Sequence, residues 1–273
     1  MRKVIVAFNG GVFSAGAMDF VRMMNEKEPV NVTGNFLPET DYTGLWTYSG
    51  VLGGSVYGRP VQEEYNAAVK ENIALFEQYC SNNHIIYQVH THFHDYALSS
   101  LMKQARYADI AVLSAESLYS NTGKNEHYEY LKEVLHAAEC SVVLTPDQLE
   151  LPANNIIAYD GSDSSVYAMK QFCYLLPELI GNPTLLVHTD EDDAVLPNAP
   201  LIKELAALHF HNISFQSLEL NARDYFATWI SEQKKGILIS GAFSKPYFTR
   251  MFKKSFVADV LKANLLPVFI AHR

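Results

Sequence analysis

Short apolar runs alternate along the chain with longer stretches in which apolar residues recur every three or four positions. The runs have the length and composition of buried strands, and the spaced stretches have the period of amphipathic helices. Strands that strictly alternate with helices predict a parallel sheet covered on both faces, so the fold class is α/β. In the first half, strands are predicted at 4–8, 30–37, 85–92, 110–114 and 142–144, and helices at 14–25, 61–79, 96–107 and 126–138.

The second half repeats this order of elements. Asn9-Gly10-Gly11 aligns with Asp160-Gly161-Ser162 at an offset of 151 residues, as does Ala17-Met18 with Ala168-Met169, and 109–114 aligns with 235–240 at an offset of 126. We infer a tandem duplication in which the first half carries extra residues between its first helix and its fourth strand. Strands are predicted near Ile156, Leu185, Ile213, Ile237 and Val268, and helices near Val166, Ile202, Tyr225 and Phe252.

Two domains follow from the duplication, at 1–148 and 149–273. Each is predicted to hold a five-stranded parallel sheet of Rossmann-like form, and a pseudo-two-fold axis is predicted to relate them. The first domain also contains a long loop at 38–60, rich in glycine, threonine and aromatic residues. Loops of this length are often functional, so it is a candidate lid, an interaction surface, or a segment packed over an empty cleft.

Composition and charge exclude several classes of protein. A hydrophobic content of 48% with 19% charged residues is ordinary for a soluble globular protein. A net charge of −9 argues against binding to nucleic acid or to an anionic membrane, because both need a basic face. The three cysteines are too widely spaced for a metal pair or a disulfide framework. Free thiols and the lack of an apolar run of signal-peptide or membrane-span length predict a cytoplasmic location.

The stretch 156–165 carries the most informative local pattern. An apolar strand stops on Asp160, the chain turns at Gly161, and Ser162 and Asp163 are suited to cap the helix that follows. In α/β domains the turn after the first strand precedes a helix whose backbone amides can hold an anion. The turn is therefore a candidate nucleotide- or phosphate-binding element.

The order of elements, this Asp-Gly-Ser turn, a glycine-bearing loop after the fourth strand and the final Leu-Pro-Val-Phe-Ile run at 266–270 together resemble the universal stress protein family. The resemblance covers both halves, so the chain is similar to a tandem universal stress protein. It implies an adenine nucleotide hydrolase-like fold in each half and an intramolecular pseudo-dimer in which the halves pair through their last strands. It also leaves open a homodimer of whole chains.

In ATP-binding members of that family, the loop after the fourth strand reads G-x-x-G, nine residues, then G followed by Ser or Thr. The glycines let the backbone approach the phosphates, and the hydroxyl adds a hydrogen bond. The second half has Gly241, Ser244, Lys254 and Ser255 at these four positions, so two of the three glycines are replaced. Basic residues at 245, 250, 253 and 254 gather in the same region, either as an anion-binding feature or as a solvated helix face.

The first half retains none of this motif. Ala115, Leu118, Tyr128 and Glu129 stand at the four positions, and Asn9 replaces the aspartate. The first half is therefore expected to have lost the site, whereas the second half keeps a damaged one.

The resemblance thus implies a non-enzymatic, cytoplasmic stress-response protein whose second half weakly binds ATP, another adenine nucleotide or phosphate. Asp160 would hold the adenine and ribose side, and the glycine loop would face the phosphates. The expected ligand-binding set is Asp160, Gly161, Ser162, Gly241, Ser244, Lys254 and Ser255.

Three alternating histidines support a different class of function. His90, His92 and His94 would share one face of a strand, and a His-x-His pair can hold zinc together with a carboxylate or water. The alternative function is a metal- or small-ligand-sensing module that uses this histidine rim without nucleotide. The other interpretation is a polar strand end in which Asp95 caps the next helix.

A third class is an ATP-using enzyme. The loop 9–14, Asn-Gly-Gly-Val-Phe-Ser, is similar to the S-G-G-x-D-S loop of ATP pyrophosphatases. Asn9 and Phe13 replace its leading serine and its aspartate, which removes polar groups from a phosphate loop. A Gly-Gly turn between a strand and a helix explains the same residues by backbone geometry.

Overall fold

The structure is a computed structural model that describes residues 1–9, 12–37, 59–91, 97–114, 135, 138–189, 195–218, 233, 235–241 and 266–271. The chain divides into two compact units, Met1–Glu139 and Cys140–Arg273. Most of the loop predicted at 38–60, most of the helix predicted at 126–138, and the helices predicted near Tyr225 and Phe252 lie outside the described residues.

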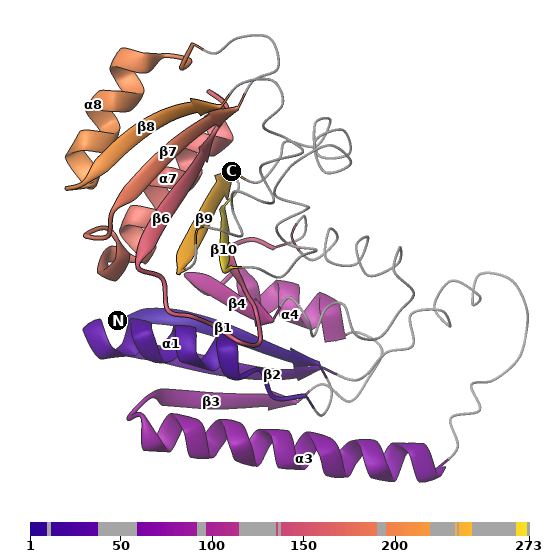
Figure 1. Cartoon of the computed structure of the whole chain (residues 1–273). Coiled ribbons are helices and arrows are strands. Elements are labelled where there is room, and N and C mark those ends of the chain that lie inside the picture. The colour runs from indigo at the N-terminus through magenta and orange to yellow at the C-terminus, as the bar shows by residue number, and fades with distance from the viewer. Residues whose placement is uncertain are drawn as a thin grey trace, which may run out of the picture. The chain divides into compact units, whose positions relative to one another are not determined.

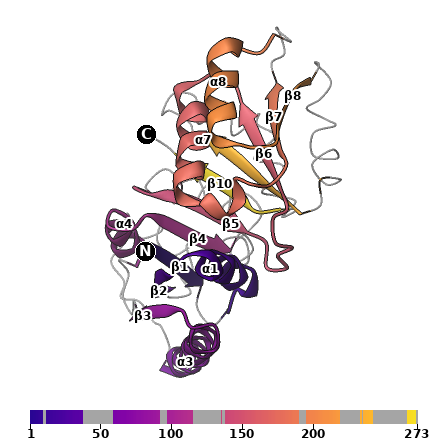
Figure 2. The ribbon, with the colours of Figure 1, turned by 90° about the vertical axis from the view of Figure 1, so that its left-hand side faces the viewer.

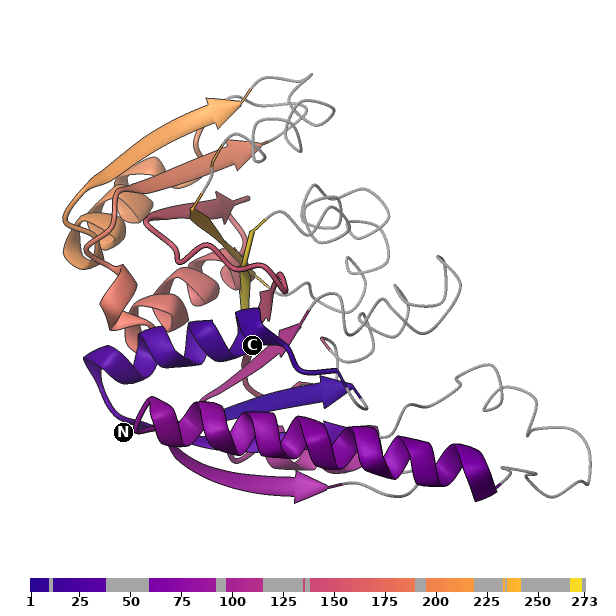
Figure 3. The ribbon, with the colours of Figure 1, turned by 60° about the horizontal axis from the view of Figure 1, so that its bottom comes forward.

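The first unit contains a parallel sheet in the order β3-β2-β1-β4 (Figure 1). Its strands are β1 (Arg2–Asn9), β2 (Val30–Leu37), β3 (Ile86–Thr91) and β4 (Ile110–Ser114), and its helices are α1 (Ala15–Lys27), α3 (Arg59–Asn82) and α4 (Ala97–Ala105). Figure 2 shows α1 and α3 on one face of this sheet and α4 on the other. The near face in Figure 3 carries α1 and α3 together.

Burial explains the apolar runs of these strands. All five residues of β4 are buried, and Val4, Ile5, Val6 and Phe8 of β1 are fully buried. Strands of a parallel sheet between two helical layers lose solvent on both faces, so they read as continuous hydrophobic runs. On β3, at the end of the strand order, exposed and half-buried residues alternate instead.

The second unit contains a sheet in the order β5-β10-β9-β6-β7-β8. All neighbouring pairs are parallel except β5 with β10, which is antiparallel. Figure 2 shows α7 and α8 on the same face of this sheet. The elements are β5 (Ser141–Thr145), β6 (Asn154–Tyr159), α7 (Asp163–Leu175), the 3-10 turn η1 (Pro177–Leu179), β7 (Thr184–Thr189), α8 (Ala199–His209), β8 (Ile213–Leu218), β9 (Gly236–Gly241) and β10 (Val268–Ala271).

The α/β class and the mainly parallel, Rossmann-like sheet predicted from sequence are confirmed. The order β3-β2-β1-β4 in the first unit has the same form as β8-β7-β6-β9 in the second, as a duplication predicts. Two details differ. β5 groups with the second unit, so the described strands divide into four and six rather than the predicted five and five, and β5 runs antiparallel to β10, although only parallel pairs were expected within each sheet. The pseudo-two-fold axis stays a prediction.

The first helix of each unit begins at a serine cap. The Ser14 side chain accepts a hydrogen bond from the Ala17 amide at 3.3 Å, and the Ser162 side chain accepts one from the Ser165 amide at 3.2 Å. These caps align the helices at an offset of 148 residues rather than 151. The connection between the first strand and the helix cap is longer in the first unit, where it spans 10–13, than in the second unit, where it spans 160–161. The sequence offset between the two helices therefore differs from the offset between the two strands.

No helix in the described ranges is both long and apolar enough to span a membrane.

Candidate functional site

The second unit places the Asp160-Gly161-Ser162 turn at the carboxyl end of β6, where the strand order reverses. The chain leaves β6 through α7 toward β7 on one side, and β9 lies on the other side of β6. In open α/β sheets, ligands bind in the crevice at such a switch point, outside the carboxyl ends of the strands. The turn and the end of β9 are therefore the candidate site.

Three hydrogen bonds fix the turn and the start of α7. Asp160 Oδ1 accepts a hydrogen bond from the Ser162 amide at 2.9 Å. The Ser162 side chain then caps the Ser165 amide, and Ser165 Oγ donates back to the Ser162 carbonyl oxygen at 2.8 Å. Asp160 itself is exposed, so it holds the turn while its carboxylate stays open to solvent.

Gly161 is required by the backbone and by its neighbour. Its φ is +78°, in the left-handed region that glycine adopts without penalty. A Cβ placed there would lie 2.7 Å from Cβ of Pro197, which precedes α8. The tight turn and the close approach of Pro197 therefore both select glycine.

Gly241, the last residue of β9, packs against the backbone of α7. A Cβ at this position would lie 2.5 Å from the Ser164 carbonyl carbon and 2.7 Å from the Ser165 amide nitrogen. Close packing of the helix on the strand therefore accounts for this glycine, whether or not a phosphate approaches it.

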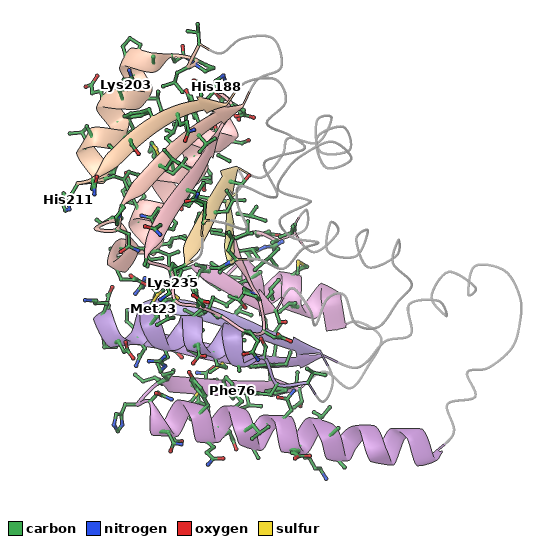
Figure 4. The ribbon with its side chains drawn as sticks, in the orientation of Figure 1. Met23, Phe76, His188, Lys203, His211 and Lys235 are labelled. Carbon is green, nitrogen blue, oxygen red and sulfur yellow. The ribbon has the colours of Figure 1, made fainter. Side chains whose placement is uncertain are left out.

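His188 lies at the end of β7 with its imidazole buried, only 1% exposed (Figure 4). Its Nδ1 is 2.9 Å from the carbonyl oxygen of Tyr159, and since a carbonyl oxygen only accepts, Nδ1 carries the proton. In the neutral tautomer that this contact selects, Nε2 is an acceptor, and within the described part of the chain it has no hydrogen-bond partner. An unsatisfied buried acceptor costs about 1–3 kcal/mol.

Tyr159 connects His188 to the turn. Its hydroxyl donates to the Pro197 carbonyl oxygen at 3.0 Å, and Pro197 contacts Gly161. Burial, and after it the nearby Asp160 carboxylate, raises the pKa of Tyr159 above its ordinary value, so the hydroxyl stays protonated.

The charge at the start of α7 is acidic. Asp160 precedes the helix and Asp163 lies in its first turn. Two carboxylates already complement the positive end of the helix dipole and oppose a phosphate at this point. Phosphate binding in this unit would therefore depend on the basic residues that follow Gly241 in the sequence rather than on the α7 start.

In the first unit, apolar rings occupy the corresponding position. Phe8 and Phe36 are paired in register on β1 and β2, as Tyr159 and His188 are on β6 and β7. Their rings stack with centroids 5.0 Å apart, and Phe13, from the connection to α1, stacks on Phe8 at 5.8 Å.

Of the predicted nucleotide-site residues, the structure brings Asp160, Gly161 and Ser162 together at one turn and sets Gly241 against the same helix. Ser244, Lys254 and Ser255 lie outside the described residues, as do His92 and His94. His90 is exposed on β3, and no metal-binding group of histidine, cysteine or acidic residues is found among the residues that can be placed. The zinc site stays a prediction.

Reasoning from sequence missed Tyr159, His188 and Pro197 as parts of this cluster. His188 carries the one available signal, a histidine at the end of a buried strand where the first half has Phe36. Pro197 and the Tyr159 hydroxyl gave no signal, because their contact joins positions 38 residues apart.

No protein-family model matches the sequence, and no curated protein does. The structure is similar to the crystal structure of a universal stress protein from Archaeoglobus fulgidus DSM 4304, with a TM-score of 0.68 and 14% sequence identity. The match covers 98% of this chain and 96% of that chain. At this identity the likeness establishes a shared fold over nearly the whole length of both proteins.

Proposed function

We propose that this chain is a tandem universal stress protein that acts non-enzymatically in the cytoplasm, and that its second unit binds an adenine nucleotide. Full-length likeness to a universal stress protein supports the class. The single observation that supports the ligand is the Asp160-Gly161-Ser162 turn at the switch point of the second sheet, directly before α7.

The nucleotide lies with its adenine and ribose beside Asp160 and its phosphates toward the chain that follows Gly241. This orientation keeps the phosphates away from Asp160 and Asp163 and directs them to the segment with Ser244, Lys254 and Ser255. One site per chain is expected, because Phe8, Phe36 and Phe13 stack at the corresponding place in the first unit.

The test is ATP binding by calorimetry to the parent protein and to Asp160→Asn. Asparagine retains the side-chain oxygen that accepts the Ser162 amide, so the turn is preserved and only the charge is lost. We expect one ATP per chain for the parent protein and at least about tenfold weaker binding for the variant, because hydrogen bonds to a charged group are worth about 1.5–3 kcal/mol.

A matched control is Asp109→Asn. Asp109 Oδ2 accepts a hydrogen bond from the Lys3 amide in the first unit, so this change also neutralises an aspartate that caps a backbone amide. Equal loss of binding in both variants, or no ATP binding by the parent protein, rejects the proposed ligand. Conversion of ATP to ADP, or to AMP and pyrophosphate, rejects the non-enzymatic role.

A further inference from the structure

We propose that His188 selects the base of the bound nucleotide, by accepting a hydrogen bond from an amino group on the ligand at Nε2. This inference rests on the proposed function and deepens it, because it names the residue that makes the second unit prefer adenine to other bases. Three observations on the described residues and one chemical argument carry it.

One contact selects the tautomer of the ring. Nδ1–H donates to the Tyr159 carbonyl oxygen with a nitrogen-to-oxygen distance of 2.9 Å, so the neutral tautomer that this contact selects presents a lone pair at Nε2. That atom is buried and has no hydrogen-bond partner among the placed residues, so its acceptor capacity is unsatisfied in the ligand-free fold.

The ring belongs to the same cluster as the turn. His188 contacts Tyr159, the Tyr159 hydroxyl binds the Pro197 carbonyl oxygen, and Pro197 lies against Gly161. A ligand seated at the start of α7 therefore lies against Gly161, which is linked to the imidazole through Pro197 and Tyr159.

The fold does not need a histidine at this position. The first unit has Phe36 at the matching register, stacked on Phe8, and both are fully buried. Aromatic hydrocarbon alone can fill this place in the sheet, so the polar atom in the second unit is not explained by packing.

The chemistry of the acceptor determines the preferred base. Adenine presents an exocyclic amino group, a hydrogen-bond donor, where guanine and hypoxanthine present a carbonyl oxygen. The amino group of adenine can donate a hydrogen bond to the Nε2 lone pair. The carbonyl oxygen of guanine or hypoxanthine would place a second lone pair against it, and the two would repel, so a buried acceptor disfavours these bases.

The experiment compares binding of ATP and inosine triphosphate, which carries hypoxanthine, to the full chain and to His188→Phe. We expect the parent protein to prefer ATP by at least about tenfold and the variant to lose that preference while keeping its melting temperature. His211→Phe is the matched control, since His211 is exposed and lies at the opposite end of this unit in Figure 4, and it should keep the preference.

A second variant keeps the test decisive if His188→Phe does not fold. The amide of His188→Gln can turn to offer either an acceptor or a donor, so we expect it to bind both nucleotides with similar affinity. Nitrogen-15 spectra of the imidazole should show the proton on Nδ1 and a change at Nε2 when ATP binds.

Each remaining outcome overturns the inference. Equal affinity of the parent protein for the two nucleotides, as expected if the imidazole only holds an enclosed water, overturns it while the proposed function stands. A preference of His188→Phe for ATP over inosine triphosphate would likewise overturn the inference and leave the proposed function standing. If the parent protein binds neither nucleotide, the proposed function fails and this inference fails with it.

Discussion

Phe8 and Phe36 stack with their ring centroids 5.0 Å apart at the register position that Tyr159 and His188 occupy in the second unit. In the second unit the two rings are 6.4 Å apart and tilted by 57°, and their polar atoms bind backbone carbonyl oxygens. At the ends of these strands, the first unit thus has a contact between two apolar rings, whereas the second unit has a hydrogen-bonded cluster. This difference between the units is the physical basis for expecting one ligand site per chain.

The first prediction concerns Phe76 of α3, which meets both Phe8 and Phe36 edge to face. Phe76→Ala should lower the free energy of unfolding by about 3–5 kcal/mol through lost burial and a residual cavity. A Cβ at Gly34 would lie 2.8 Å from the Phe76 ring, so Gly34→Ala should also destabilise the protein. The double variant should lose less unfolding free energy than the two single variants lose together, because the smaller side chain at 76 makes room for the added methyl group. Urea unfolding of the four proteins measures this coupling, and effects that simply add would contradict the packing.

The second prediction concerns Gly161. Gly161→Ala should cost about 1–2 kcal/mol from the left-handed backbone alone, with a further cost from the contact with Pro197. Gly181→Ala is the control, because a Cβ there would meet nothing within 4 Å. Urea unfolding should show a clear loss for the first variant and little change for the second, and similar curves for the two would refute the geometry of the turn.

The third prediction separates two roles of Gly241. Because a Cβ would collide with the α7 backbone at Ser164, Gly241→Ala should lower the melting temperature in the absence of any nucleotide. Thermal unfolding monitored by circular dichroism provides the measurement, again with Gly181→Ala as reference. If the variant melts normally and is defective only in ATP binding, the glycine serves the phosphates and not the helix contact.

The fourth prediction concerns pH. Burial, and next the hydrogen bond that the Tyr79 hydroxyl donates to Asp19 at 2.6 Å, raise the pKa of Tyr79 from 10.0 to about 12. The folded state therefore keeps a proton that the unfolded chain releases above about pH 10. This contribution is complete below pH 10 and is lost as the pH rises toward 12.

Unfolding free energies of the parent protein and of Tyr79→Phe, measured from pH 9 to 12, check this sign. The stability advantage of the parent protein over the variant should shrink as pH rises, because phenylalanine has no proton to release. The buried thiols of Cys80 and Cys173, whose pKa values burial raises to about 12, titrate in the same window in both proteins and cancel in the difference. A constant difference would show that the Tyr79 hydroxyl does not titrate differently in the folded state.

The fifth prediction is a stabilising change. Lys235 has a φ of +62°, and its carbonyl oxygen accepts hydrogen bonds from the amides of Ala153 and Asn154. Lys235→Gly should relieve about 1 kcal/mol of backbone strain while keeping both hydrogen bonds. Lys170→Gly within α7 should have the opposite sign and cost about 1 kcal/mol. Chemical denaturation measures both, and destabilisation by Lys235→Gly would show that the left-handed conformation carries no strain.

Local signals predicted most of the elements well. The strands predicted at 30–37 and 110–114 match β2 and β4 residue for residue, and Ser162 caps α7 as its position before the apolar spacing predicts. These features depend on neighbours a few residues apart, which a single sequence contains in full.

By itself, the sequence determined the α/β class, the repeated succession of strands and helices along the chain, and the turn at Asp160, because periodicity, capping and turn chemistry act over short stretches of chain. Only the tertiary structure decided that Gly241 is required by the α7 backbone, that β5 runs antiparallel to β10, and that His188 is buried beside Tyr159 with an Nε2 that has no partner among the described residues. Each of these depends on two segments that are distant along the chain and meet only when the sheet forms, so no local pattern of residues encodes them.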